Sequence, residues 1–217
     1  MYRYMLSTVY EKSMELLQKL TLYDLFGYTF PGVIALLLFY GDVSYLAEEL
    51  TLGGLVLLAV LGYVAGVMIT ELAECLECLV KKILGESKIK AYWEKLCGDY
   101  GITDVKVNDA LLQAKLIENA QNDSAGVVAR KYRTYMYSEI QTDSQYSRLH
   151  NYASAELLYK NMAVTAVFAT GIGVVQQNTA EIIIGVVSAV LFVRRRICFA
   201  ERSRGYTLCW FVQKYSR

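Results

Sequence analysis

The chain contains one uninterrupted apolar stretch of full membrane-spanning length, LGGLVLLAVLGYVAGVMIT (Leu52–Thr70). A helix needs roughly 20 apolar residues to cross the hydrocarbon core of a bilayer. The stretch holds no charged residue, so it predicts a transmembrane helix. The composition of the 217 residues agrees with this, because 55% are hydrophobic and only 20% are charged.

Three shorter apolar stretches accompany the first. They cover about 25–40, 161–175 and 180–193, and each reaches spanning length only with uncharged flanking residues. Together the four stretches predict an all-α integral membrane protein with two transmembrane hairpins. The alternative is a soluble α-bundle in which these helices are buried.

The placement of positive charge predicts the orientation. None of the 22 Lys and Arg lies in the four spans, in the segment Gly41–Thr51 or in the turn Gln176–Thr179. Instead Lys81 and Lys82 follow the second span, and Arg194 begins a run of three arginines after the fourth. Positive residues beside spans are retained in the cytoplasm. Both termini and the polar segment between spans two and three are therefore expected there.

The chain divides by this topology into a first part (1–78), a helical cytoplasmic domain (79–158) and a second part (159–217). The first part holds an N-terminal amphipathic helix and the first transmembrane hairpin, and the last holds the second hairpin and a basic tail. No cleavable signal peptide is expected, because a charged stretch precedes the first apolar run. The expected helices of the cytoplasmic domain cover Ser87–Leu96, ending near Gly98 and Gly101; about Val107–Ala120, with Asp104 or Asn108 as N-cap; a helix from near Ser124; and one from about Asp143 that runs into span three.

Small residues recur along three of the spans. Such rows let helix backbones approach closely, which drives association where lipid removes the hydrophobic contrast. They predict either contacts between subunits or ordinary packing within one chain. The residues are Gly62 and Gly66 in span two, Ala169 and Gly173 in span three, and Gly185 and Ala189 in span four.

Carboxylates mark the cytoplasmic end of span two. Glu71, Glu74 and Glu77 are spaced by three and share one helix face. In a ring-shaped oligomer they would form carboxylate rings at a pore mouth, with Thr165 and Thr170 as polar residues along the pore. The alternative is a solvated helix face whose carboxylates balance the charge of the nearby lysines. No ionisable residue lies at mid-membrane depth, which disfavours a proton-coupled transporter.

Basic and tyrosine residues gather in the cytoplasmic domain. Basic side chains hold phosphates and tyrosines stack on bases in sites for single-stranded nucleic acid. A nucleotide or oligonucleotide ligand is therefore one reading, and a basic surface facing anionic lipid is the other. Duplex nucleic acid is not expected. The candidate ligand residues are Arg130, Lys131, Arg133, Tyr135, Arg148 and His150.

Signatures of catalysis and metal binding are missing from the sequence. There is no phosphate loop, GxSxG or HExxH motif, and a single histidine leaves few acid–base schemes. Cys75 and Cys78 form a lone CxxC, whereas zinc needs four ligands. We expect no catalytic residue, metal or cofactor, and reduced cysteines.

Two segments carry a resemblance to a known family. YDLFGYTFPGVIALLLFYG (Tyr23–Gly41) is similar to the first span of small bacterial membrane proteins of defence islands, and SRLHNYASAELLYKNMAV (Ser147–Val164) is similar to the segment before their third span. The layout resembles four-span abortive-infection effectors such as the membrane effector of the Hailong system.

This resemblance implies an oligomeric channel in the bacterial inner membrane that depolarises the cell during phage infection. It also implies a signal made by a partner nucleotidyltransferase and sensed by the cytoplasmic domain. The competing hypothesis is a non-catalytic membrane-anchored scaffold that recruits a soluble partner.

Overall fold

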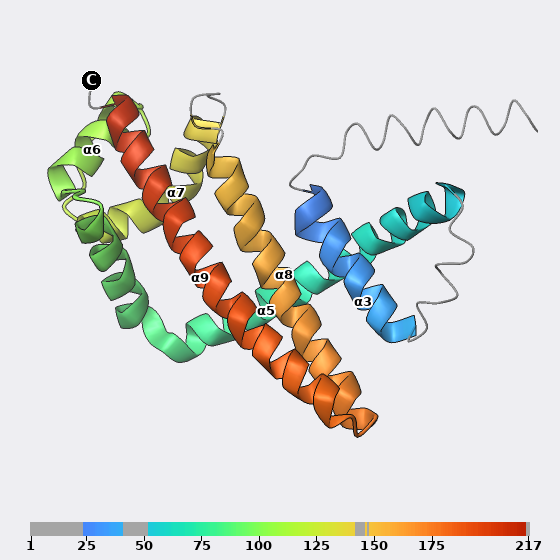
Figure 1. The fold of residues 1–217 in the computed structure, drawn as a ribbon. Coiled ribbons are helices and arrows are strands. Elements are labelled where there is room, and N and C mark those ends of the chain that lie inside the picture. Colours follow the sequence, from blue (N-terminus) through green and yellow to red (C-terminus); the bar gives the residue numbers. More distant parts are fainter. Residues whose placement is uncertain (1–23, 41–51, 142–145, 147, 216–217) are drawn as a thin grey trace, which may run out of the picture. The chain divides into compact units, whose positions relative to one another are not determined.

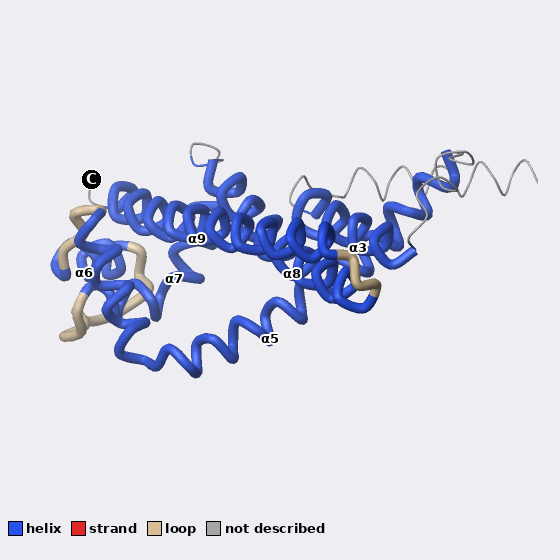
Figure 2. Tube along the Cα trace, turned by 60° about the horizontal axis from the view of Figure 1, so that its bottom comes forward, coloured by secondary structure: helices blue, strands red, loops and turns tan. Residues whose placement is uncertain are grey.

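The computed structural model describes residues 24–40, 52–141, 146 and 148–215, which form helices and no strand (Figures 1 and 2). The all-α prediction is confirmed for this part of the chain. The predicted loop Gly41–Thr51 and the predicted N-terminal amphipathic helix lie outside it. The elements are η1 (Leu25–Thr29, a π-helical turn), α3 (Phe30–Tyr40), α5 (Leu52–Asp99), α6 (Asp104–Gln113), α7 (Ala125–Gln141), α8 (Arg148–Val175) and α9 (Thr179–Tyr215).

Two of the described helices are long and apolar enough to cross a membrane. One is Gly53–Ile83 within α5, and the other is α8, Arg148–Val175. Leu25–Phe39 is a shorter apolar helix. Helix α9 begins with the predicted fourth span and continues through the three arginines to Tyr215 without interruption.

The chain forms two compact units. Unit 1 comprises Met1–Glu74 and Leu157–Arg196, and unit 2 comprises Cys75–Glu156 and Ile197–Arg217. Helices α5, α8 and α9 each contribute residues to both units. The basic tail therefore groups with the polar segment Cys75–Glu156 and not with the apolar helices that precede it in the chain.

Unit 2 has its own hydrophobic core. Trp93 and Leu96 from α5 pack with Leu111 from α6 and Met136 from α7, and Phe211 from α9 is fully buried among them. The tail is therefore part of the fold of unit 2, because α9 supplies the largest fully buried side chain of the described residues.

Two glycines with positive φ end or interrupt the helical segments of α5. After α5, Gly101 adopts φ 64°, and the N–H of Ile102 bonds the carbonyl of Cys97 at 2.9 Å. This is the Schellman arrangement, which favours glycine in the left-handed position. The predicted end near Gly101 is confirmed. Within α5, Gly85 has a positive φ of 76° with an extended ψ of 158°, and it breaks the helix just before the predicted start at Ser87.

Helix α6 differs from its prediction at both ends. Its N-cap is Thr103, whose hydroxyl accepts from the N–H of Lys106 at 3.4 Å. The predicted caps serve other elements, since Asp104 accepts from the N–H of Ala125 at the start of α7 and Asn108 bonds the backbone of Gln121. The helix ends at Gln113 instead of Ala120, because a lysine, Lys115, takes the left-handed position (φ 56°).

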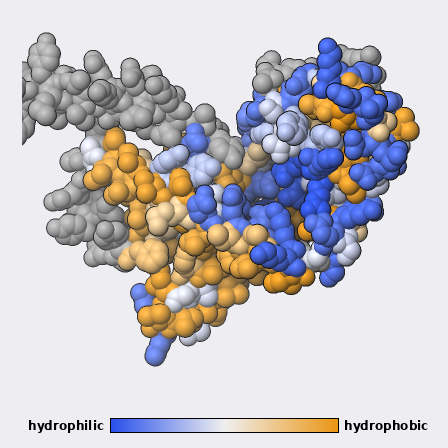
Figure 3. Space-filling view, turned by 180° about the vertical axis from the view of Figure 1, so that it is seen from behind, coloured by the Kyte–Doolittle hydropathy of each residue, from blue (hydrophilic) through white to orange (hydrophobic). Residues whose placement is uncertain are grey.

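The surface of unit 1 is largely apolar. Only 22% of the apolar window in Gly53–Ile83 and 33% of that in Arg148–Val175 is buried. Exposed aliphatic residues continue along α9, including Ile184, Val187 and Val190. Figure 3 shows hydrophobic residues covering much of unit 1 on the face drawn and hydrophilic residues dominating unit 2.

Candidate functional site

A backbone carbonyl in the π-helical turn η1 lacks its usual helical donor. Pro31, the single proline of the chain, has no N–H, so the carbonyl of Gly27 four residues earlier lacks its helical donor. The π-helical turn η1 ends just before this proline, at Thr29. The side-chain amide of Asn161 on α8 donates to the Gly27 carbonyl at 2.7 Å. A distant helix thus supplies the hydrogen bond that the proline removes.

Asn161 joins three helical segments through its amide. It is 0% exposed, and its Nδ2 also donates to Thr70 Oγ1 on α5 at 2.7 Å. Thr70 in turn donates to the carbonyl of Gly66 at 2.9 Å. The Asn161 Oδ1 is buried and has no hydrogen-bond partner among the described residues. We call Gly27, Gly66, Thr70 and Asn161 the polar node.

Close backbone contact surrounds the polar node. A Cβ on Gly32 would lie 1.8 Å from the carbonyl oxygen of Gly62, and one on Gly66 would lie 1.9 Å from that of Tyr28. The predicted packing residues Gly62 and Gly66 therefore hold the first apolar helix against α5 within one chain. This is the ordinary packing alternative for that row.

The second row of small residues lies between α8 and α9, which run antiparallel in Figure 1. A Cβ on Gly173 would lie 3.0 Å from the backbone of Ile182, and one on Gly185 would meet Thr170 Oγ1 at 2.3 Å. Ala169 and Ala189 are half-buried in the same two helices. This row also packs within the chain.

The threonines predicted along a pore lie in this packing. Thr165 is 1% exposed and donates to the carbonyl of Asn161 at 3.0 Å. Thr170 is half-buried and donates to the carbonyl of Ala166 at 2.9 Å. In a single chain both hydroxyls are satisfied by their own helix.

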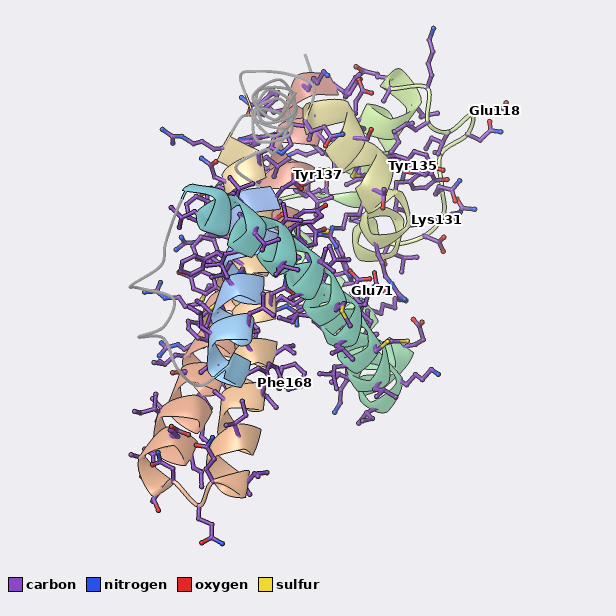
Figure 4. The ribbon with its side chains drawn as sticks, turned by 90° about the vertical axis from the view of Figure 1, so that its right-hand side faces the viewer. Glu71, Glu118, Lys131, Tyr135, Tyr137 and Phe168 are labelled. Carbon is purple, nitrogen blue, oxygen red and sulfur yellow. The ribbon has the colours of Figure 1, made fainter. Side chains whose placement is uncertain are left out.

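The three carboxylates at the end of span two have different surroundings. Glu71 is exposed on α5, where Figure 4 labels it. Glu74 pairs with Lys160 at 3.2 Å, within unit 1. Glu77 pairs with Lys81 at 3.0 Å, within unit 2. At least two of the three therefore have cationic partners in the chain itself.

In unit 2, Arg204 contacts side chains from two other helices. Arg204 on α9 donates to the Tyr92 hydroxyl at 3.2 Å and lies 3.7 Å from a carboxylate oxygen of Glu156. Its guanidinium stacks over Tyr92 and lies 5.9 Å from the Trp93 ring. Its Nε is buried without a partner among the described residues.

The predicted ligand residues on α7 divide between two sides of that helix. Lys131 and Tyr135 are exposed and lie one turn apart, on the side opposite Tyr137 in Figure 4. Arg133 and Tyr137 follow the other face and are half-buried. Burial and then the Arg204 guanidinium hold the pKa of Arg133 below its ordinary value. Burial also raises the pKa of Tyr137.

Arg130 faces a cavity between α5 and α7. Its guanidinium forms two hydrogen bonds with the carboxylate of Glu86, at 2.6 and 3.1 Å. This contact lowers the pKa of Glu86. A cavity of about 320 Å³ lies here and is lined by Glu86, Ser87, Lys90, Gly126, Val127 and Arg130.

The remaining predicted ligand residues lie at the start of α8. Arg148 and His150 are exposed, and the His150 ring lies 6.3 Å from that of Tyr137. The six residues therefore do not form one continuous surface. The cavity at Arg130 and the cluster around Arg204 were not predicted, because neither Glu86 nor Arg204 stands out by local sequence pattern.

The cysteines are dispersed over the described residues. Cys75, Cys78 and Cys198 are exposed, while Cys97 is buried in the core of unit 2, where burial raises its pKa to about 11. No group of three or more His, Cys, Asp or Glu able to hold a metal ion occurs among the described residues.

The chain was compared with protein-family models, with curated proteins and with solved structures, and none of them matches it.

Proposed function

We propose that the chain is a four-span protein of the bacterial inner membrane that forms a homo-oligomeric channel controlled by unit 2. In this proposal unit 1 lies in the bilayer, and unit 2 lies in the cytoplasm with both termini. The observation that carries the proposal is the continuity of α8 and α9, each of which runs without interruption from residues of one unit to residues of the other.

Continuous helices suit the transmission of a signal. Gating requires two states and a ligand that prefers one of them. A change in unit 2 at Glu156 or Arg204 acts on the same helices that carry Asn161 and Gly185 in unit 1.

The exposed apolar surface supports a lipid environment. The apolar windows of the two spanning helices are mostly exposed, whereas the core helix of a soluble protein would be mostly buried. The lack of Lys and Arg in both predicted external segments supports the proposed orientation.

A stripe on α5 supports self-association. Leu72, Leu76, Leu79 and Ile83 are all exposed, Ile83 by 85%, and they are spaced four, three and four residues apart. This is the spacing of a coiled-coil seam. A second copy of α5 would bury the stripe, so Leu76→Glu with Leu79→Glu should reduce the oligomer to a monomer in detergent. The exposed exchange Lys82→Glu is the control.

The role in defence rests on the resemblance to abortive-infection effectors. It adds a nucleotide or oligonucleotide signal made by a partner nucleotidyltransferase, and a non-catalytic response in which the open channel depolarises the cell. The decisive experiment is co-expression of the chain and its partner during phage challenge, with a dye that reports membrane potential. Unchanged potential and normal growth would reject the channel.

The second candidate is a membrane-anchored scaffold, which the separate hydrophobic core of unit 2 favours. Replacing both hairpins with an unrelated anchor distinguishes the two. A scaffold keeps its activity after the exchange, whereas a channel loses it.

A further inference from the structure

The cavity between α5 and α7 is rich in hydrogen-bond donors. Lys90 and Ser87 line it from α5, and Arg130 and the backbone of Gly126 line it from α7. Lys90 is only loosely paired, at 3.8 Å from Glu94, and both side chains are about half exposed. Such an exposed pair contributes little, so the ammonium group remains available to an anion.

One backbone donor at the start of α7 is free. The first N–H groups of a helix have no partner within it. The N–H of Ala125 donates to Asp104, and those of Val127 and Val128 donate to the carbonyl of Ser124. The N–H of Gly126 has no acceptor among the described residues. It therefore adds a donor, at the positive end of the helix dipole, to the wall of the cavity.

A glycine is required at this position. A Cβ on residue 126 would lie 2.7 Å from the backbone nitrogen of Glu94, so a side chain would push α7 away from α5. Gly126 thus brings the start of α7 close to the segment of α5 that carries Lys90.

In this structure the Glu86 carboxylate binds the guanidinium of Arg130. The contact is bidentate, but the Glu86 side chain is 80% exposed, so solvent screens it. Glu86 directly follows the break of α5 at Gly85, where a Cβ would meet nothing within 4 Å. The carboxylate is thus held mainly by Arg130, and a more highly charged anion can replace it.

We propose that this cavity binds a phosphate group, with Arg130 exchanging the Glu86 carboxylate for the phosphate and Lys90, Ser87 and the Gly126 N–H completing the site. The inference rests on the proposed sensing role of unit 2 and names the chemistry that it recognises. The phosphate belongs either to a soluble nucleotide or to the headgroup of an anionic lipid. When the phosphate displaces Glu86 from Arg130, the ion pair that joins α5 and α7 is also broken.

The test uses opposite substitutions in the two members of the ion pair. The full chain in detergent is titrated with pyrophosphate by calorimetry. Glu86→Gln removes the competing carboxylate and should tighten binding about ten-fold, whereas Arg130→Gln should weaken it at least ten-fold. Lys95→Gln, an exposed change on α5 outside the cavity lining, should leave the affinity unchanged.

A purely structural ion pair gives a different pattern. In that case Glu86→Gln and Arg130→Gln lower thermal stability alike, and neither changes pyrophosphate binding in a specific direction. Binding to Glu86→Gln no tighter than to the unsubstituted chain, or undiminished binding to Arg130→Gln, overturns the proposal.

Nanodiscs distinguish the two sources of phosphate. If lipid headgroups fill the cavity, pyrophosphate binding is lost in phosphatidylglycerol discs and kept in phosphatidylcholine discs. If the ligand is soluble, the affinity is the same in both; either pattern supports the phosphate site. The titration does not depend on ion conductance. Tight pyrophosphate binding without any effect on membrane potential would therefore support the phosphate site and contradict the channel proposal.

Discussion

Replacement of Asn161 by alanine tests how the polar node holds unit 1 together. The substitution removes two hydrogen bonds of 2.7 Å, to the Gly27 carbonyl and to Thr70 Oγ1. Each such bond contributes about 1 kcal/mol, and a buried carbonyl left without a donor costs about 1–3 kcal/mol. Thr70 keeps its own bond to Gly66, so its loss is smaller. We expect a destabilisation of about 2–4 kcal/mol.

The measurement is unfolding of the detergent-solubilised chain by sodium dodecyl sulfate, followed by circular dichroism. The matched control is Asn151→Ala, an exposed asparagine on the same helix, which should change the free energy of unfolding by less than about 0.5 kcal/mol. Equal effects of the two substitutions would contradict the reasoning, since only Asn161 is buried.

A double-mutant cycle isolates the role of the proline. Pro31→Ala restores an N–H that can reach the Gly27 carbonyl, so this carbonyl no longer depends on Asn161. In that background Asn161→Ala should cost about 1 kcal/mol less than in the original chain. Additive effects would show that Asn161 does not compensate for Pro31, even if each single change is destabilising.

Three further predictions concern packing and titration. Gly66→Ala should destabilise unit 1 by about 2 kcal/mol or more in the same assay, because its Cβ would lie 1.9 Å from the Tyr28 carbonyl oxygen, whereas Gly171→Ala meets nothing within 4 Å and should be neutral. Thiol alkylation of the folded chain at pH 8 should label Cys75, Cys78 and Cys198 before Cys97, whose pKa is about 11, and equal rates would contradict its burial. Glu139 accepts from the Tyr215 hydroxyl at 2.6 Å and from Lys214, which lowers its pKa below the ordinary 4.5. Because the pKa of Glu139 is lower in the folded state, the ionised carboxylate stabilises the fold at pH values above its unfolded-state pKa, and this contribution is lost as the pH falls through its folded-state pKa. Glu139→Gln should therefore reduce the loss of stability on the acid side of the pH profile. An unchanged profile would show that the contact is absent.

Sequence patterns predicted the helices better than their ends. The break after α5 was predictable, because Gly101 is the residue type that the left-handed position favours. The end of α6 was not, because Lys115 takes the same conformation without a glycine to mark it. The end of α8 at Val175 agrees with the predicted end of the third apolar stretch, although Gln177, which is not a glycine, takes the left-handed position just after it. Thr103 was missed as a cap because two other capping residues, Asp104 and Asn108, follow it closely.

The candidate site was less predictable than the fold for a physical reason. Arg130 was singled out by its type, but its partner Glu86 lies 44 residues away on another helix. The half-buried contacts of Arg204 likewise link α9 with α5 and α8. Local composition indicates which residues are charged, whereas tertiary packing decides which of them meet.

The two segments on which the proposed likeness to defence effectors rests meet at one place in the structure. The first contains Gly27 and Pro31, and the second contains Asn161; the buried amide of the second bonds the carbonyl that the proline of the first leaves free. A proline placed four residues after a buried carbonyl removes its usual helical donor, and an asparagine amide on a facing helix is a compact way to supply one. The two patterns are thus one structural feature, and any chain that has the first without a donor at the second position should lack this contact. If four-span effectors of otherwise different sequence contain the same hydrogen bond, the proposed likeness would include the packing of the first and third apolar helices. If they contain the proline without a matching donor, the likeness would be limited to similar composition.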